Sequence, residues 1–359
     1  MLFIPHKHLY ISGTSYVSAD EPDYKEVITD ANSRRRMGRL LKMAVWCGLK
    51  SLDGVPSERV AGIITSTGAG FMKDTISFGS SIFDREETLL NPSPFMQSTF
   101  NTASGYIALI RKIHAYNTTY VQRADGFAAS LVDAAMLLDD AGEGDVALVG
   151  TFDEVTPEVD VIRQRLGLYR VGDCFLPLGE GAAAFLLSAA MPTDVSGSCP
   201  ATESSTGPGG NDGSESASER GGDANSECST GPLHESESAS RPFDESGSES
   251  SSEPLHDSGE TSSRSLNVTK DGNAALRFCG LANLSDLPKF AENPIAELFG
   301  INACVNVISC ADHVESLGAF RSLLPVLLCK LISEQKIPDG YTAIVDDVNE
   351  NGVIVLLHK

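Results

Sequence analysis

The stretch "TYVQRADGFAAS", residues 119–130, reads as a short strand, a sharp turn and the first turn of a helix. Turns of this kind often present a catalytic nucleophile at their tip. Here no Cys, Ser or Thr stands at the tip, which holds Arg123, Ala124, Asp125 and Gly126. The stretch therefore predicts the scaffold of an active site without its nucleophile.

The residues after the turn predict a buried helix, because their apolar side chains recur at helical spacing. This stripe consists of Phe127, Leu131, Ala134 or Ala135, and Leu138. The next segment, "GDVALVGT" at 144–151, is a short apolar run typical of a strand. Strand, turn, helix and strand together make a βαβ unit, in which the two strands lie close to one another.

The same alternation continues on both sides of this unit. Further strands are predicted at 60–67 ("VAGIITST"), 182–188 ("AAAFLLS"), 304–309 ("CVNVIS") and 351–359 ("NGVIVLLHK"). Helices are predicted at 33–52, 102–116 and 317–333, the first with Met37, Leu40, Leu41, Ala44, Val45 and Leu49 on its buried face, the second with Ile107, Ile110 and Ile113. Uninterrupted apolar strands between helices indicate a sheet covered on both faces, hence α/β layers.

A change of composition divides the chain. Residues 191–270 are rich in Ser, Glu, Gly and Pro and hold 15 acidic and 4 basic residues, a net charge of −11. Such a segment buries too little apolar surface to offset the entropy of ordering, so we expect a disordered, solvated insert, with an acidic docking or phosphorylated tail as the alternative. The expected organisation is 1–190, the insert 191–270, and a short block 271–359 of the same fold.

Charge and composition exclude several classes of function. The 359 residues carry a formal net charge of −22, which disfavours nucleic acid and anionic membranes as partners. No apolar run is long enough to span a bilayer, and the N-terminus lacks the unbroken apolar stretch of a signal peptide, so a cytoplasmic location is expected. The eight cysteines form no CxxC pair. No metal-ligand spacing, phosphate-binding loop or dinucleotide motif appears, so we expect neither metal nor cofactor. Most cysteines, Cys174 included, are expected to be buried as small apolar residues.

Five segments, in order, resemble motifs of the β-ketoacyl synthases of the thiolase superfamily. They are "RRRMGRLLKMAV", "GIITSTGAGF", "SPFMQSTFNTASGYIAL", "DAGEGDVALVGTFDEV" and "LGEGAAAFLLS", across residues 34–188. The resemblance implies a thiolase-like layered αβαβα fold of two related halves, here with a shortened C-terminal half. It also implies condensation of acyl and malonyl groups on an acyl carrier protein, with an acylated Cys at the turn and two His residues from the second half.

This chain departs from the family at each of those positions. Matching "SLVDAAM" to the family helix places Ala124 at the nucleophile position, or Asp125 with a shift of one residue. Gln122 lies two residues upstream, and a Gln replaces the nucleophile in chain-length factors, the non-condensing partners of aromatic polyketide synthases. A strand residue that points outward is the alternative for Gln122, and a helix cap is the alternative for Asp125.

The second half departs further. The resemblance places Glu315 where the family has a His at the start of a buried helix, and His313 lies two residues earlier. A His beside a helix start is more often a solvated or capping residue. No segment of 271–359 resembles the family's other His motif. Ser98, Thr99, Thr102, Ser104 and Ser130 are possible replacement nucleophiles, but no base accompanies them in the sequence.

The sequence thus favours a catalytically impaired partner subunit, similar to a chain-length factor, in fatty-acid or polyketide synthesis. Its expected partners are an acyl carrier protein and either a catalytically intact ketoacyl synthase, as a heterodimer, or a second copy of this chain, as a homodimer. The dimer is expected to form across the strand "TTYVQ", 118–122, with the helix at 102–115 nearby. An active acyltransferase or 3-oxoacyl synthase with a non-standard nucleophile, and an acyl-chain or carrier-protein binding module, are the alternatives.

Overall fold

In the computed structural model, the N-terminal half contributes five neighbouring strands to one sheet, in the order β4-β3-β5-β8-β2. They are β2 (Leu9–Val17), β3 (Val60–Ser66), β4 (Tyr116–Tyr120), β5 (Val146–Asp153) and β8 (Gly181–Ser188). Both β4 and β5 run parallel to β3. β8 is antiparallel to β5, and β2 is antiparallel to β8. β4 forms the end of the sheet.

The C-terminal half repeats this order without its outermost strand. Its strands are β9 (Leu276–Asn283), β10 (Val305–Ser309), β11 (Tyr341–Val345) and β12 (Val353–His358), in the order β10-β11-β12-β9. The pairing is parallel for β10 with β11, and antiparallel for the other two neighbours, as in the first half. Among the strands that the structure describes, β4 has no counterpart in this half. The predicted shortening of the C-terminal half is therefore confirmed.

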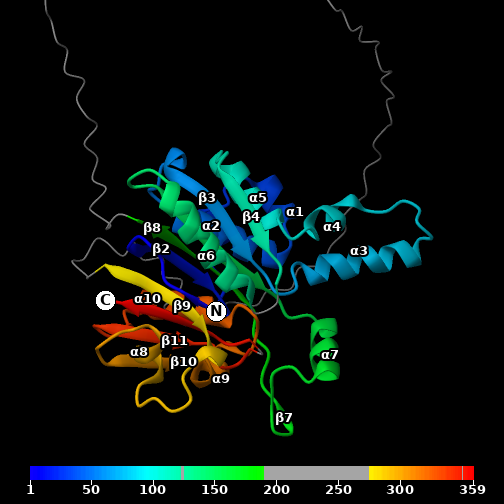
Figure 1. Cartoon of the computed structure of the whole chain (residues 1–359). Helices are drawn as coiled ribbons and strands as arrows, with labels where there is room; N and C mark the ends of the chain where they lie inside the picture. The colour runs from blue at the N-terminus through cyan, green and yellow to red at the C-terminus, as the bar shows by residue number, and fades with distance from the viewer. Residues whose placement is uncertain (123–124, 190–274, 350) are drawn as a thin grey trace, which may run out of the picture. The chain divides into compact units, whose positions relative to one another are not determined.

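The two sets of strands meet where β2 pairs with β9, through Leu9 to Ile11, and the short β1 (Leu2–Phe3) also pairs with β9. Figure 1 shows the first set in blue to green and the second in yellow to red, side by side at this junction.

Helices separate and cover the two sets of strands. Between them lie α6 (Asp125–Asp140) and α10 (Leu323–Ser333), whose apolar side chains share one core with both sets. α2 (Arg39–Ser51) and α5 (Thr102–Arg111) cover the other face of the N-terminal strands. The short α8 (Pro294–Leu298) covers part of the other face of the C-terminal strands. The layers are thus αβαβα, the predicted thiolase-like arrangement.

The remaining elements lie at the rim of these layers. They are α1 (Ala31–Arg36), α3 (Met72–Asp84), α4 (Pro92–Gln97), α7 (Pro157–Leu166) and α9 (Val314–Leu317), the hairpin β6 (Arg170–Val171) and β7 (Cys174–Phe175), and short 3-10 turns at Tyr24–Glu26, Ser57–Arg59, Leu284–Asp286 and Ala311–His313. Figure 1 shows α3 and α7 standing away from the sheet, and α3 has no buried residue.

The structure describes residues 1–122, 125–189, 275–349 and 351–359, and places Asp125 as the first residue of α6. The predicted insert 191–270 lies outside these residues, so its disorder and the domain limits at 190 and 271 stay predictions.

Most predicted core stripes are confirmed, whereas several details are wrong. The helix predicted at 102–116 ends at Arg111, and Tyr116 begins β4. All six apolar residues predicted for the first helix are buried, as are Phe127, Leu131, Ala134, Ala135 and Leu138. Ile110 is instead 41% exposed, and Cys174 is exposed in β7. The predicted helix 33–52 is two helices, because the backbone N–H of Gly38 donates to Gln97 Oε1 at 2.6 Å and Gly38 begins a new helix as its N-cap.

Candidate functional site

The strand and the helix on either side of the predicted turn are present, and the strand lies two residues earlier than predicted. β4 ends at Tyr120, α6 begins at Asp125, and the backbone N–H of Thr67 donates to Tyr120 O at 3.0 Å. That bond ties the end of β3 to the end of β4. Gln122 is exposed between the two elements. Arg123 and Ala124, the predicted tip and nucleophile position, lie outside the described residues, and Asp125 is described only as the start of the helix.

Gln122 lines a cavity of about 990 Å³, which we call the elbow cavity. One wall comes from β4 and α6 and includes Tyr120, Val132 and Asp133. The opposite wall comes from loops of the C-terminal half and includes Asn349 and Asn351. The cavity is of the size that proteins use for small-molecule ligands. Its lining includes Gln122, which lies two residues before the predicted nucleophile position in the sequence.

The polar side chains that line the elbow cavity are four amides, one phenol, one hydroxyl and one carboxylate, from Gln122, Asn283, Asn349, Asn351, Tyr120, Ser285 and Asp133. Tyr116 OH donates to Asp133 Oδ2 at 3.0 Å. Partial burial, followed by the negative charge of Asp133, raises the pKa of Tyr120 to about 12, so its phenol stays protonated at neutral pH. The described residues that line the cavity include no Cys or His. These groups can therefore bind a polar ligand but supply neither a thiolate nor an imidazole.

Asn349 fixes the loop between β11 and β12 and connects the elbow cavity to a second one. Its Nδ2 donates to Asp346 Oδ2 at 2.7 Å and to Phe320 O at 3.3 Å. Its Oδ1 accepts from Tyr169 OH at 3.1 Å. Burial raises the pKa of the Asp346 carboxyl, which also accepts from the backbone N–H groups of Val348 and Asn349.

The second cavity, of about 240 Å³, lies along α7, and we call it the α7 cavity. Its lining is largely apolar and includes Ile162 and Leu166 of α7 and Phe320. The guanidinium of Arg321 lies 5.9 Å from the centre of the Tyr169 ring. Arg163 also lines this cavity, as do two carboxylates. A largely apolar cavity with a few charged groups at its wall is suited to an apolar chain that carries a polar group.

Asp153 joins the two halves of the chain beside the α7 cavity. Its Oδ1 accepts from the backbone N–H of Gly68 at 2.8 Å and from Thr67 Oγ1 at 3.1 Å. Its Oδ2 accepts from Ser322 Oγ at 2.5 Å, and Ser322 also bonds to Thr151 Oγ1. Burial raises the pKa of the Asp153 carboxyl, although four donors offset part of the effect. Sequence reasoning included Asp153 in a motif without a role, and its position at the end of a buried strand was the available signal.

Glu315 and His313 do not lie at the start of the buried helix. The structure ends α9 at Leu317, and α10 begins only at Leu323. Glu315 is exposed, and neither residue lines the elbow or the α7 cavity among the described lining residues. The cause of the break is Gly318, whose φ is +77° and where a Cβ would lie 2.3 Å from the backbone N of Gly179.

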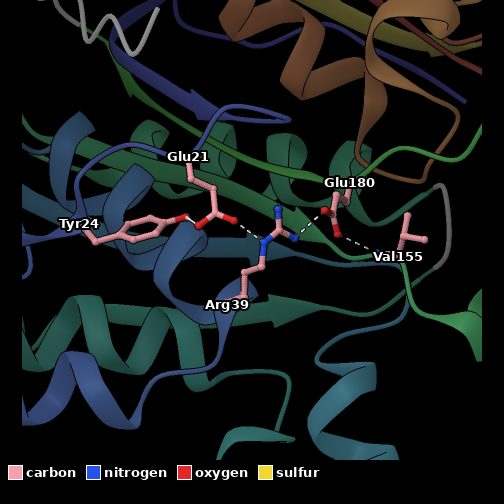
Figure 2. Close-up of polar contacts among 5 residues, drawn as sticks. All are labelled: Glu21, Tyr24, Arg39, Val155 and Glu180. Carbon is pink, nitrogen blue, oxygen red and sulfur yellow. Dashed lines mark hydrogen bonds and ion pairs between the residues drawn. The ribbon is translucent and has the colours of Figure 1, made fainter. Parts of the chain in front are cut away.

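Charged residues of two further motifs meet in one network, shown in Figure 2. Arg39 donates to Glu180 Oε1 at 2.5 Å and also to Glu21. Glu180 Oε2 accepts from the backbone N–H of Val155 at 3.1 Å, and Glu21 accepts from Tyr24 OH at 3.0 Å. These contacts hold the start of α2 against the segments before β8 and after β5, so these side chains are positioning groups for the fold.

The replacement nucleophiles considered from the sequence have structural partners. Ser130 Oγ donates to Phe127 O at 2.7 Å inside α6, and Ser104 Oγ donates to Asn101 O. Thr99 and Thr102 bond to one another and to Met96 O, and Ser98 donates to Phe95 O. Within the described ranges, no group of three or more His, Cys, Asp or Glu side chains is arranged to hold a metal ion. No described helix is long and apolar enough to cross a membrane.

Comparison with known proteins identifies the family. Residues 14–204 match the family model "Beta-ketoacyl synthase, N-terminal domain". No curated protein sequence matches the chain. One similar solved structure is the ishigamide ketosynthase/chain length factor, with 12% identity, coverage of 98% of this chain and 99% of that chain, and a TM-score of 0.56. Another is the AntDE:AntF complex of a type II PKS acyl-carrier protein with its ketosynthase, with 13% identity, coverage of 98% of this chain and 99% of that chain, and a TM-score of 0.56. A β-ketoacyl synthase from Burkholderia phymatum STM815 has 10% identity, coverage of 98% of each chain and a TM-score of 0.54.

Proposed function

The chain belongs to the β-ketoacyl synthase family, and from this membership we propose that it is a non-condensing subunit, similar to a chain-length factor, in fatty-acid or polyketide biosynthesis. The observation that carries the proposal is the turn between β4 and α6, where residues 121–126 include no Cys, Ser or Thr. Decarboxylative condensation needs a thiolate to hold the acyl chain and donors to stabilise the enolate. The described lining of the elbow cavity offers no such thiolate. A carboxylate beside the malonyl group would also repel the negative charge that develops on the enolate.

A subunit without its own nucleophile acts by shaping a partner's site, and β4 is the edge available for that contact. Among the described strands β4 pairs with β3 alone, which leaves its other edge open. Leu109 and Ile110 of α5, and Tyr116 of β4, are 74%, 41% and 46% exposed. An open strand edge beside exposed apolar side chains favours pairing with another chain. We infer that the partner is an intact ketoacyl synthase or a second copy, and that an acyl carrier protein delivers the substrate.

Intact-mass measurement tests the absence of a nucleophile. The purified protein is incubated with acyl-carrier-protein thioesters, and the expected spectrum shows no covalent acyl adduct. Ala124→Cys is expected to restore little condensation, because a thiolate alone does not stabilise the enolate. A native adduct mapped to any residue between Gln122 and Ser130 contradicts the proposal and favours the active enzyme with a non-standard nucleophile.

A module that binds acyl chains or the carrier protein without a synthase partner is the second candidate, and the elbow and α7 cavities favour it. Sedimentation separates the two candidates. A partner subunit forms a dimer alone or with a synthase encoded beside it. A stand-alone module remains a monomer in both cases while still binding the acyl carrier protein.

A further inference from the structure

The C-terminal half leaves part of its outer sheet face open. In the first half, α2 and α5 cover the corresponding face with a broad core. In the second half, the described α-helix that contributes to this outer core is α8, which has five residues. Beside α8, four half-buried polar residues face one another across neighbouring strands, in the order Tyr10, Arg277, His358 and Tyr341. Residues paired directly across strands lie on one face of a sheet, so this row lies together on the open face.

A cavity of about 290 Å³ lies at this row, between residues 4–8 and the end of α8. Its polar lining includes His6, His8, Arg277 and Cys279, and we call it the Arg277 cavity. Phe299 and Leu356 supply apolar surface at its base. The described lining includes Lys7 and Arg277 and no Asp or Glu. In a chain with a net charge of −22, such a basic cavity is an exception, and its local field attracts anions.

Arg277 is a half-buried cation of this cavity without an acidic partner among the described residues. In the described part of the chain no Asp or Glu forms an ion pair with it, whereas His6 contacts Asp139 Oδ2 at 3.3 Å. Lys7 donates to Leu138 O at 3.0 Å, at the end of α6. The described side-chain partners of Arg277 are His8 and Cys279, and neither is a carboxylate. A half-buried guanidinium is costly unless a negatively charged group meets it.

His8 adds a second donor to the same place. Arg277 Nη1 lies 3.4 Å from His8 Nδ1, and because a guanidinium has no lone pair to share, Nδ1 is the acceptor. The proton of neutral His8 is then on Nε2, where it remains available to a ligand. Arginine N–H groups and an imidazole N–H beside them match the several oxygens of a phosphate better than the two of a carboxylate.

We propose that the Arg277 cavity binds a phosphate group, as inorganic phosphate or as a phosphate monoester whose organic part lies against the apolar base. The site is separate from the elbow cavity. The described linings of the two cavities have no residue in common. The site is therefore distinct from the proposed acyl chemistry, and its test is independent of it.

Calorimetry on the full chain in chloride buffer tests the proposal, with sodium phosphate, glycerol phosphate and sodium acetate as the probes. Phosphate and glycerol phosphate are expected to bind, acetate to bind more weakly, and Arg277→Gln to weaken phosphate binding about tenfold or more, since charge-assisted bonds to Arg are lost. Arg35→Gln is the matched control, because Arg35 is exposed on α1. Tighter binding of glycerol phosphate identifies a monoester as the ligand, and equal or weaker binding identifies inorganic phosphate.

Alkylation gives a second readout that does not depend on the variant. Cys279 lines the cavity, whereas Cys174 and Cys304 are exposed elsewhere. Saturating phosphate is expected to slow alkylation of Cys279, mapped by mass spectrometry, and to leave Cys174 and Cys304 unchanged. Thermal unfolding of Arg277→Gln and Arg277→Lys verifies that both variants fold. Any one of three results overturns the proposal. These are an unchanged phosphate affinity in a folded Arg277→Gln protein, alkylation of Cys279 that phosphate does not slow, and equal affinities for acetate and phosphate.

Discussion

At the residue scale, Asp153 shows how the two halves of the chain are held together beside the α7 cavity. One carboxylate accepts from the glycine loop after β3 and from Ser322, the residue before α10. Buried polar groups of this kind stabilise a structure only while every partner is satisfied. The sequence motif identified the residue, but its partner in the second half is 169 positions away in the chain and no local pattern announces it.

Asp153→Asn is expected to destabilise the protein by about 1–3 kcal/mol, because an amide has one accepting oxygen and its NH₂ faces donors. Denaturant unfolding measures the loss, and Asp133→Asn, an exchange of the same kind in the elbow cavity, is the control. Equal stability of Asp153→Asn and the native protein contradicts the assigned role.

The difference in the free energy of unfolding between the native protein and Asp153→Asn is expected to depend on pH with a defined sign. The pKa of Asp153 is raised in the folded state, mainly by burial, so its protonation favours folding and this stabilisation is lost as pH rises through the raised pKa. The stability margin of the native protein over Asp153→Asn is therefore expected to increase as pH falls from neutral toward about 4. Unfolding curves of both proteins across this range measure the margin, and a margin that shrinks on acidification contradicts the assignment.

At the scale of elements, the break between α9 and α10 separates what periodicity predicts from what it does not. Periodicity correctly places a buried helix before Ser333, and the residues from Leu323 to Cys329 are buried. It does not reveal that Gly318 adopts a positive φ or that Ala319 N donates to Pro177 O at 2.7 Å. Those contacts join segments that are distant in the sequence, and they separate α9 from α10. Glu315, which sequence order alone matched to the start of the buried helix, therefore lies on α9 and is exposed.

Gly318→Ala tests this account. A Cβ at Gly318 would lie within 2.5 Å of three backbone atoms at Leu178 and Gly179, so we expect a loss of about 2 kcal/mol or more in the free energy of unfolding. Gly79→Ala is the matched control, because a Cβ at Gly79, inside α3, would meet no atom within 4 Å, and the exchange should gain up to about 1 kcal/mol. Equal effects of the two exchanges contradict the role of Gly318.

At the scale of the whole molecule, the layered fold follows from the sequence more fully than the site does. Alternating apolar strands and helices carry the layers, because burial on both faces leaves a clear pattern. The sequence pointed to the turn at residues 121–126 for the candidate site, whereas the described cavity also takes Asn349 and Asn351 from a loop of the second half, which no local pattern announces. The orientation of Ile110 also escaped prediction, since helical spacing alone does not distinguish a core stripe from an interface stripe.

Leu109→Glu is expected to convert a dimer to monomers, because a charge at the exposed apolar side chain beside β4 disfavours a desolvated interface. Leu166→Glu is the matched control, since Leu166 is 62% exposed on α7. Sedimentation of both variants, alone and with a co-encoded synthase, measures the effect. A native protein that is monomeric in both conditions contradicts the assembly through β4.

Deletion of residues 191–270 is expected to leave cooperative unfolding intact, because the segment is acidic and poor in core residues. Thermal unfolding of the shortened and full chains measures this. A large loss of cooperativity on deletion contradicts the prediction.

The position of β2 has a further consequence for the covalent chain. β2 pairs with β8 on one side and with β9 on the other, so the last strand before the long segment and the first strand after it flank one common neighbour. A peptide-bond break within 191–270 would therefore separate two fragments that share a sheet and the core between α6 and α10. Co-expressed fragments 1–190 and 271–359 are expected to complement each other as a split protein. In the intact chain, residues 191–270 act as a tether that raises the effective concentration of the two parts.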